Sequence, residues 1–378
     1  AARLSGSGAS TITFNNLNTN YALSGTGGIL TVTSPGQVTV DQTLNFASGI
    51  GITSTTGITL GANVTPGANL SLTTGSGPIN QTAGSLFANS GTASFNAGTG
   101  DLTLGSIGNQ FNVVNLTGGS VAVTASNGLI VNTLASGANR NVSLASGAGQ
   151  LILVGAPINA GTGNISISSG ADILSGADLS GANISIQAQA GLDLSTNITA
   201  TGSLLLATTA GSGITQSGGA IVAGGLTTAT AGPLPITLTQ PGNDFSSFAA
   251  TGTAISVRDA NALNLGAVNA STSLAVQTNG NLTQNAPVVV SGTTTVIAGI
   301  GNVNLTTAGN NLNSLSVNAN AIDIVEGVGS SLVVTALTSG LNQPVRLVAG
   351  HTLTLPPSTP INTGTANLTL ASNTGPLV

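Results

Sequence analysis

The sequence holds few side chains that could carry out acid–base or nucleophilic chemistry. His351, in the segment AGHTLTLP, is the single imidazole, so a catalytic triad or a histidine-ligated metal would have to use it. Neither a G-x-S-x-G nor an H-E-x-x-H pattern surrounds it. We therefore expect His351 to lie in a turn or to face solvent.

Paired carboxylates are the other route to catalysis, because glycoside hydrolysis uses two carboxyl groups about 5–10 Å apart. The candidates are Asp172 with Asp178, and Asp323 with Glu326. In coils of about 22 residues, Asp172 would also approach Asp193 on the next coil. No Asp-Asp, Gly-His-Gly or Arg-x-Lys segment accompanies these acids. We interpret them as turn caps and expect no catalytic residue.

Metal and cofactor sites are likewise not expected. The chain has no Cys, and Asp178, Asp244 and Asp259 are too scattered to form a calcium cluster. The absence of Lys removes Schiff-base chemistry and the phosphate-binding lysine of a P-loop. Four Arg against nine acids give a net charge of −5, so nucleic acid is not an expected partner. We expect Arg140 and the neighbours Arg258 and Asp259 to make local ion pairs or to bond turn carbonyls.

The composition indicates a folded chain of an unusual kind. Charged residues make up 3% of the 378 residues, whereas an ordinary soluble domain has about 25%. Disorder requires low hydrophobicity and high charge, and this chain has neither. No apolar run approaches the roughly 18 residues of a membrane helix. Because the chain has no Met or Cys and begins Ala1-Ala2-Arg3, we expect a processed bacterial protein, secreted or at the cell surface.

A repeat of about 67 residues organises the sequence. Three windows align without a gap, at 97–111, 231–245 and 298–312, and the first interval between their starts is twice the second. A degenerate copy is expected at 160–194, between the first two windows. The approximate repeats are then 79–146, 147–213, 214–281 and 282–348, with terminal coils at 1–78 and 349–378.

Within each copy, apolar and small polar residues alternate, which is typical of short strands with one buried face. Leu102-Thr103-Leu104 is one such run, and Gly, Asn, Asp or Ser-Gly bounds each of them. Three runs and the corner that follows each supply the predicted core ladder: Leu102, Leu104, Phe111, Ile236, Leu238, Phe245, Val303, Leu305 and Leu312.

Strands this short are unstable alone and become stable when successive coils stack, so the sequence predicts an all-β chain, 1–378, that forms one continuous parallel β-solenoid. A coil of about 22 residues would place three coils in each repeat and about 17 in the chain. Asn109, Asn243 and Asn310 occupy equivalent corners and are predicted to form a turn ladder of amides. An outer-membrane barrel would need aromatic girdles, and a sandwich would not show this period.

The repeat style resembles that of a known family. The segments INQTAGSLFANSGTASFNAGTGDLTLGSIGNQF (79–111) and ITQSGGAIVAGGLTTATAGPLPITLTQPGNDF (within 214–268) are similar to repeats of filamentous-haemagglutinin-type, two-partner-secreted exoproteins. The resemblance extends over about 79–327. It implies a right-handed β-helix shaft, export through an outer-membrane secretion partner, and a place on the bacterial surface.

A structural role follows as the expected function. Both ends of the chain lack an evident cap, so we expect a non-enzymatic filament subunit that stacks head to tail on copies of itself. The alternative is a rigid shaft segment of a secreted adhesin of the family just named. More remote alternatives are a polysaccharide-active enzyme and an ice-binding solenoid with Thr rows. The residues expected at the polymer contact are Arg3, Phe14, Leu368, Leu370, Leu377 and Val378.

Overall fold

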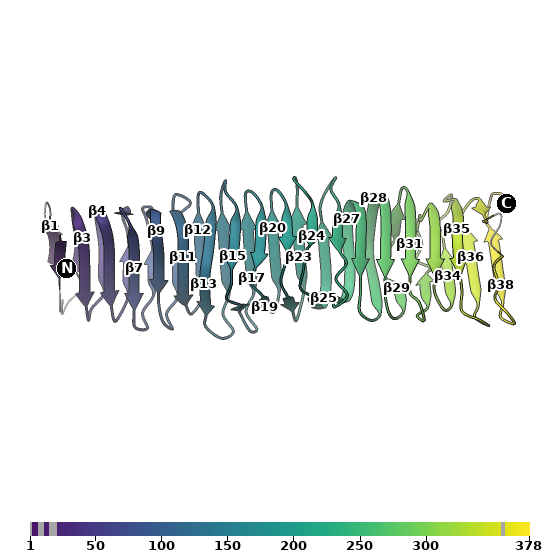
Figure 1. Ribbon diagram of the computed structural model, residues 1–378, viewed down its shortest axis with the longest axis horizontal. Helices are drawn as coiled ribbons and strands as arrows, with labels where there is room; N and C mark the ends of the chain where they lie inside the picture. The colour runs from purple at the N-terminus through teal and green to yellow at the C-terminus, as the bar shows by residue number, and fades with distance from the viewer. Residues whose placement is uncertain (1, 7–10, 15–20, 357–359) are drawn as a thin grey trace. The chain divides into compact units, whose positions relative to one another are not determined.

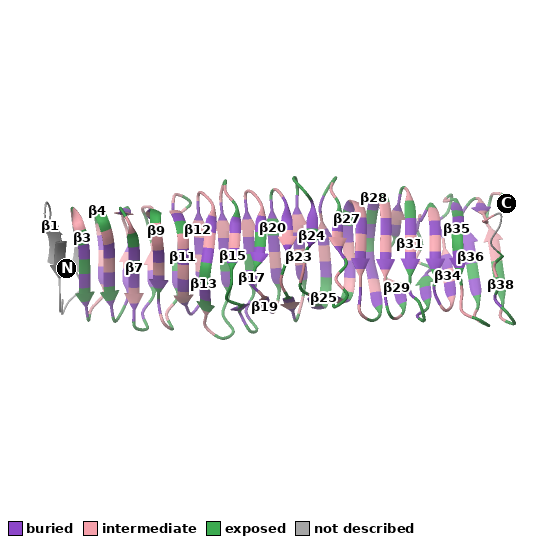
Figure 2. Cartoon of the chain, in the orientation of Figure 1, coloured by how far each residue is buried: buried purple, intermediate pink, exposed green. Residues whose placement is uncertain are grey.

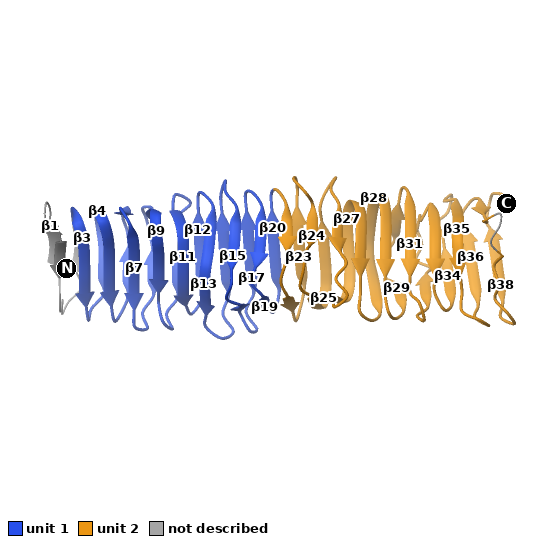
Figure 3. Cartoon of the chain, viewed as in Figure 1, with its two compact units in different colours: residues 1–189 blue, residues 190–378 orange. Residues whose placement is uncertain are grey.

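The computed structural model describes residues 2–6, 11–14, 21–356 and 360–378, and all regular structure in this part is β-strand (Figure 1). The chain divides into two compact units at residues 189 and 190 (Figure 3). The strands of the first unit are β1 Ala2–Gly6, β2 Thr11–Phe14, β3 Tyr21–Ser34, β4 Val38–Ser54, β5 Ile58–Leu60, β6 Val64–Pro66, β7 Asn69–Thr74, β8 Ile79–Gln81, β9 Phe87–Asn96, β10 Leu102–Leu104, β11 Gln110–Gly118, β12 Val121–Ala125, β13 Leu129–Ser136, β14 Val142–Ser146, β15 Leu151–Val154, β16 Ile158–Asn159, β17 Ile165–Ser169, β18 Ile173–Gly176, β19 Leu179–Gly181 and β20 Ile184–Ala188. Those of the second are β21 Leu192–Leu194, β22 Ile198–Ala200, β23 Leu204–Thr208, β24 Ile214–Gln216, β25 Ile221–Thr230, β26 Ile236–Leu238, β27 Asp244–Arg258, β28 Leu263–Gln277, β29 Leu282–Gln284, β30 Val288–Val290, β31 Thr293–Ile297, β32 Val303–Leu305, β33 Ser314–Asn318, β34 Ile322–Val325, β35 Leu332–Thr338, β36 Val345–Ala349, β37 Leu353–Thr354 and β38 Leu368–Ser372.

In each unit, strands of successive coils pair side by side and in parallel. In the first unit, Leu102 of β10 pairs with Val121 of β12, which pairs with Val142 of β14. The predicted parallel β-solenoid is therefore confirmed, with about 17 coils. The coils are slightly shorter than the expected 22 residues, at about 20.

The core consists of the alternate residues that point inward from each strand, as the bands of burial in Figure 2 show. β12 illustrates the pattern, because Val121, Val123 and Ala125 are buried while the two residues between them are half-buried. Every member of the predicted core ladder is at most 2% exposed. The larger inward side chains also meet each other, as in the edge-to-face contact between Phe95 and Phe111, whose ring centroids are 5.8 Å apart.

The sequence repeat spans three coils and one further strand. In the second unit, one row of paired residues extends over three coils, from Ile236 through Ile255 and Leu274 to Thr294. The counterpart of Ile236 one repeat later is Val303, which lies in the next strand and pairs with Leu282 in a different row. Equivalent residues of successive repeats therefore occupy neighbouring faces of the coil.

Sharp turns recur at equivalent positions of the three aligned windows. Gly98, Gly232 and Gly299 have φ of 57°, 55° and 57°, in the left-handed region that glycine adopts without strain. Each follows a fully buried alanine that lies just beyond a strand. The Ala-Gly pair that opens every window therefore marks a corner of the coil.

The buried aromatic pair supports a stability prediction. Phe111→Ala should lower the free energy of unfolding by about 3–5 kcal/mol, because it removes a fully buried ring and leaves a cavity beside Phe95. Ile107→Ala is the control, since Ile107 is 82% exposed, and should change stability by less than about 0.5 kcal/mol. Urea unfolding followed by circular dichroism measures both, and equal effects would contradict the assigned core.

Candidate functional site

The structure places His351 at an exposed corner after β36. Its Nδ1 lies 2.9 Å from the hydroxyl of the adjacent Thr352, so the imidazole is engaged by its neighbour in the chain. No carboxylate among the described residues is hydrogen-bonded to it.

The candidate carboxylates point to separate partners. Asp172 accepts a hydrogen bond from the Gln150 amide at 3.0 Å, within the first unit. In the second unit, Asp193 accepts one from the Ser217 hydroxyl at 2.7 Å. Asp178 is half-buried in the turn that precedes β19, and its backbone carbonyl accepts the N–H of Ile158 at 2.8 Å.

The side chains of Asp323 and Glu326, the second expected pair, lie on opposite sides of the β-sheet that forms the solenoid: one is exposed and the other is buried. Asp323 is exposed at 40% and forms a 2.8 Å ion pair with Arg346 on the next coil. Glu326 is 4% exposed and turns inward, where both carboxylate oxygens lie 3.1 Å from the backbone nitrogen of Leu312. The structure therefore does not bring these two carboxylates to a common substrate position.

The described residues also contain no group of three or more His, Asp or Glu side chains that could hold a metal ion. Asp259, one of the calcium candidates, is fully buried and accepts the backbone N–H groups of Phe245 and Asn261. In the part of the chain that the structure describes, no helix is long and apolar enough to cross a membrane.

A buried pair of side-chain amides recurs at one corner of each clear repeat. In every copy the Asn and a Gln of the preceding coil exchange two hydrogen bonds of 2.8–3.0 Å. The pairs are Asn109 with Gln81, Asn243 with Gln216, and Asn310 with Gln284. Because all three asparagines are fully buried, their polar atoms depend on these partners.

The same asparagine also satisfies two backbone groups. In the second unit, Asn243 Oδ1 accepts the N–H of Ile221 at 2.9 Å, and its Nδ2 donates to the carbonyl of Leu238 at 3.2 Å. The corresponding bonds recur around Asn109 and Asn310. The cluster therefore ties neighbouring coils together through a buried corner.

A third polar residue completes each corner by accepting the backbone N–H that lies two residues beyond the asparagine. Asn127 accepts the N–H of Phe111 at 3.3 Å, and Asp259 accepts that of Phe245 at 2.7 Å. Glu326 takes this role in the last clear repeat. Burial raises the pKa of the Glu326 carboxyl to about 7, against the lowering effect of the Leu312 N–H. Burial also raises the pKa of Asp259, opposed by its two backbone hydrogen bonds and assisted by the nearby charge of Asp244.

The predicted turn ladder needs correction. Asn243 and Asn310 lie three coils and a strand apart, so they do not stack, and each bonds a glutamine instead. A different set of exposed asparagines forms the ladder on successive coils. The N–H of Asn164 donates to Asn141 Oδ1 at 2.9 Å, and the N–H of Asn183 to Asn164 Oδ1 at 3.2 Å.

The glutamine partners were missed as site residues although the sequence carries a signal for them. They end the triplets INQ, ITQ and LTQ, which precede the corner asparagine by 28, 27 and 26 residues. A separation a few residues longer than one coil, at two polar positions repeated three times, indicates contact between neighbouring coils.

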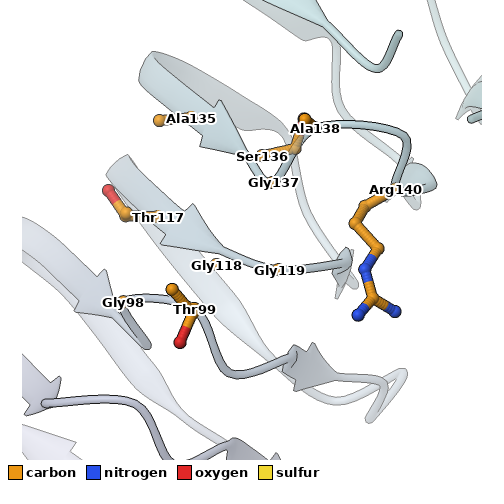
Figure 4. Close-up of a pocket in the computed structure, with 10 residues that line it drawn as sticks. All are labelled: Gly98, Thr99, Thr117, Gly118, Gly119, Ala135, Ser136, Gly137, Ala138 and Arg140. Carbon is orange, nitrogen blue, oxygen red and sulfur yellow. The ribbon is translucent and has the colours of Figure 1, made fainter. Parts of the chain in front are cut away.

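Arg140 lies at the edge of a shallow depression of about 260 Å³ at one corner of the first unit (Figure 4). The depression is lined by glycines and small residues, among them Gly118, Gly119 and Gly137. An added Cβ at Gly119 would come within 2.7 Å of the Thr99 carbonyl, so close packing of coils explains the small residues. Arg140 is exposed and has no ion pair among the described residues, so the ion pair, one of the two arrangements expected for it, does not form there.

The last described coil has an open strand edge. β38 pairs with β36 on one side, and Leu368 and Leu370 stand in the rows of Val345 and Leu347. The two residues of β36 are at most 1% exposed, whereas Leu368 is 43% exposed and Leu370 is half-buried. Leu377 and Val378 are 51% and 68% exposed, so four of the six predicted contact residues have apolar side chains that are exposed or half-buried.

The other two predicted contact residues lie near the start of the chain. Arg3 belongs to β1 and pairs through its backbone with Ala22, and Phe14 belongs to β2 and pairs with Val32. Their side chains lie outside the described part.

These features define a repeat protein whose parallel β-solenoid is closed at its corners by buried amides. A family model described as repeats of unknown function (DUF5649) matches residues 47–117, 181–251 and 252–318, which together are more than half of the chain. The chain belongs to this family. Its matched segments begin at 47, 181 and 252, whereas the predicted repeats begin at 79, 214 and 282, so the two descriptions differ in phase. No curated protein and no solved structure matches the chain.

The corner amides support a second stability prediction. Asn243→Ala should reduce the free energy of unfolding by about 3 kcal/mol, because it leaves the Gln216 amide, the Ile221 N–H and the Leu238 carbonyl without the hydrogen bonds that Asn243 makes to them. Asn269→Ala is the matched control, because Asn269 is exposed on β28 and should tolerate the change within about 0.5 kcal/mol. Urea unfolding of the two variants measures the difference, and similar losses would refute the structural role of Asn243.

The Glu326 carboxyl supports a pH prediction. Its folded pKa of about 7 exceeds the unfolded value of 4.5, so the folded state retains a proton that the unfolded state releases. Stability should therefore fall as pH rises through this window, by at most about 3 kcal/mol, with Asp259 acting in the same direction. Glu326→Gln should remove most of the decline between pH 5 and pH 8, as Asn127 shows that an amide fits an equivalent corner.

Urea unfolding at the two pH values measures this effect. Asp323→Asn serves as the control, because it changes an exposed carboxylate three residues before Glu326 and should keep the decline. A Glu326→Gln protein with an undiminished decline would show that another group is responsible.

Proposed function

We propose that this protein is a non-enzymatic structural subunit of an extracellular bacterial filament, in which copies stack head to tail by continuing the solenoid. The observation that carries the proposal is the open edge of β38 with its exposed apolar rows. An edge strand offers unpaired N–H and C=O groups to a further strand. Charged side chains, which commonly block such pairing, are nearly absent from the chain.

The energetics favour a second copy of this chain as the partner at β38. A coil placed on β38 would cover Leu368, Leu370 and Leu377, and burying each such side chain contributes about 1.5–3 kcal/mol. The first described strands, β1 and β2, pair in parallel with β3, as the strands of later described coils pair with one another. A second copy that presents these strands would continue the existing pairing without a new type of contact. The separate engagement of the carboxylates supports a role without catalysis.

A second candidate is a rigid shaft segment of a longer protein similar to the filamentous-haemagglutinin-type exoproteins, exported with an outer-membrane secretion partner. The same open edge would then receive the next coil of one chain. The tandem family repeats favour this candidate, because such repeats add coils without changing the corner chemistry.

Negative-stain electron microscopy of the purified chain separates the two candidates. We expect unbranched fibres one solenoid wide, or small bundles of them, with little dependence on salt because few charges take part. Leu368→Asp should abolish the fibres by placing a charge in the inward row. Thr369→Asp puts the same charge on the outward side of the same strand and should leave the fibres intact.

Particles of one chain each under all conditions would contradict the filament and favour the shaft. Loss of fibres in both variants would show that charge on β38, regardless of its direction, prevents association.

A further inference from the structure

Arg258 ends β27 on the outer surface of the second unit, and it has no ion pair among the described residues. Its neighbour Asp259 turns inward and is occupied by the N–H groups of Phe245 and Asn261, at 2.7 and 2.8 Å. The expected local pair of Arg258 and Asp259 is therefore wrong, because successive residues of an extended chain point to opposite sides.

The guanidinium also has an unsatisfied donor. Arg258 Nε is buried from solvent and has no hydrogen-bond partner. A buried donor without an acceptor is unfavourable by about 1–3 kcal/mol, and such groups are rare in folded proteins. By contrast, Arg346 on the same unit is paired with Asp323.

Arg258 is one of the residues that line a groove of about 330 Å³, a volume within the usual range for ligand clefts. Arg258, Gln277 and Ile297 follow one another on successive coils along one side. The exposed Thr239 and the half-buried Ser256, Ala275 and Thr295 also line it and supply hydroxyl and methyl groups. No acidic side chain is among the lining residues, so no carboxylate of the groove competes for the guanidinium.

We propose that this groove binds a saccharide that carries a carboxylate, such as a uronic acid residue, with the carboxylate on Arg258. Guanidinium and carboxylate match as a planar, two-bond pair, and the charge strengthens both hydrogen bonds. The Gln277 amide and the hydroxyls of Ser256 and Thr295 suit the ring hydroxyls. The site goes beyond the proposed structural function and does not depend on whether filaments form.

The alternative occupant, an acidic peptide, is disfavoured by the backbone. Peptides commonly bind sheets by adding a strand at an open edge. Here the strand segment around Val257 pairs with Leu238 on one coil and Val276 on the next, so its backbone offers no free edge. Recognition in this groove must come from side chains, which suits a ligand rich in hydroxyl groups.

Titration of the full chain by isothermal calorimetry tests the proposal, with tri-galacturonic acid as the probe and its methyl ester as the uncharged counterpart. We expect saturable binding of the acid and binding of the ester weaker by about tenfold or more. Arg258→Gln should weaken binding of the acid to the same extent, and Arg258→Lys should restore part of it because charge returns without the planar fork. Arg140→Gln, which removes an exposed and unpaired arginine from the first unit, should have no effect.

A second measurement keeps the test decisive if a variant does not fold. In amide nuclear magnetic resonance spectra of the unmodified chain, the acid should shift the signals of residues 256–258, 275–277 and 295–297. The proposal is overturned if the acid does not bind, if the ester binds equally well, or if the shifts lie elsewhere. Equal or tighter binding of a tri-glutamate peptide would overturn it in favour of a peptide partner.

Discussion

The structure depends on one constraint. The nearest neighbour of each side chain, inward or outward, is the side chain at the same position of the next coil, so the two must pack together. In parallel in-register pairing, like positions stack at the strand spacing of about 4.8 Å. Leu, Ile and Val stack in the interior without penalty, and the row from Leu102 through Val121 to Val142 is an example. Like charges at that spacing would repel, so outward positions carry Thr, Ser and Asn. The near absence of charge in the composition is a direct result of this stacking.

The same constraint makes the corners the difficult part of the fold. In the strands, backbone N–H and C=O groups are hydrogen-bonded to the neighbouring coils. At a corner the backbone leaves this pairing, and some of its N–H and C=O groups are buried in the solenoid without a backbone partner. In each clear repeat the Gln and Asn side chains hydrogen-bond these buried backbone groups and each other, because each amide carries both donors and acceptors. The third corner residue needs only to accept one N–H, and accordingly Asn127, Asp259 and Glu326 all serve there. A carboxylic acid at this position makes the stability of the corner depend on pH. The first clear repeat has Asn127 there, which does not titrate.

Much of the fold could be predicted from the sequence, because alternation and repeat length are local and periodic signals. They identified the solenoid and the buried residues such as Phe111 and Phe245. The stacking of Asn243 on Asn310 was predicted wrongly, since the coils are too short to divide the repeat into three. The direction in which Asp259 points also escaped prediction, because the sequence does not show where β27 ends and therefore which side the next residue faces. The groove beside Arg258 depends on residues from four coils, and no single segment of sequence contains that arrangement.

The repeat length of three coils and one strand has a consequence for how the surface is decorated. A side chain that recurs once per repeat moves to the neighbouring face each time, as Ile236 and Val303 show for the interior. A residue that occurs once in every repeat therefore follows a helical path around the solenoid. Its copies do not line up along one face. A flat partner lying along one face would therefore not meet the same feature at successive repeats. Single-face patterns, such as a Thr plane, cannot be maintained by duplicating this unit, whereas a partner that winds around the solenoid would meet an identical contact at every step.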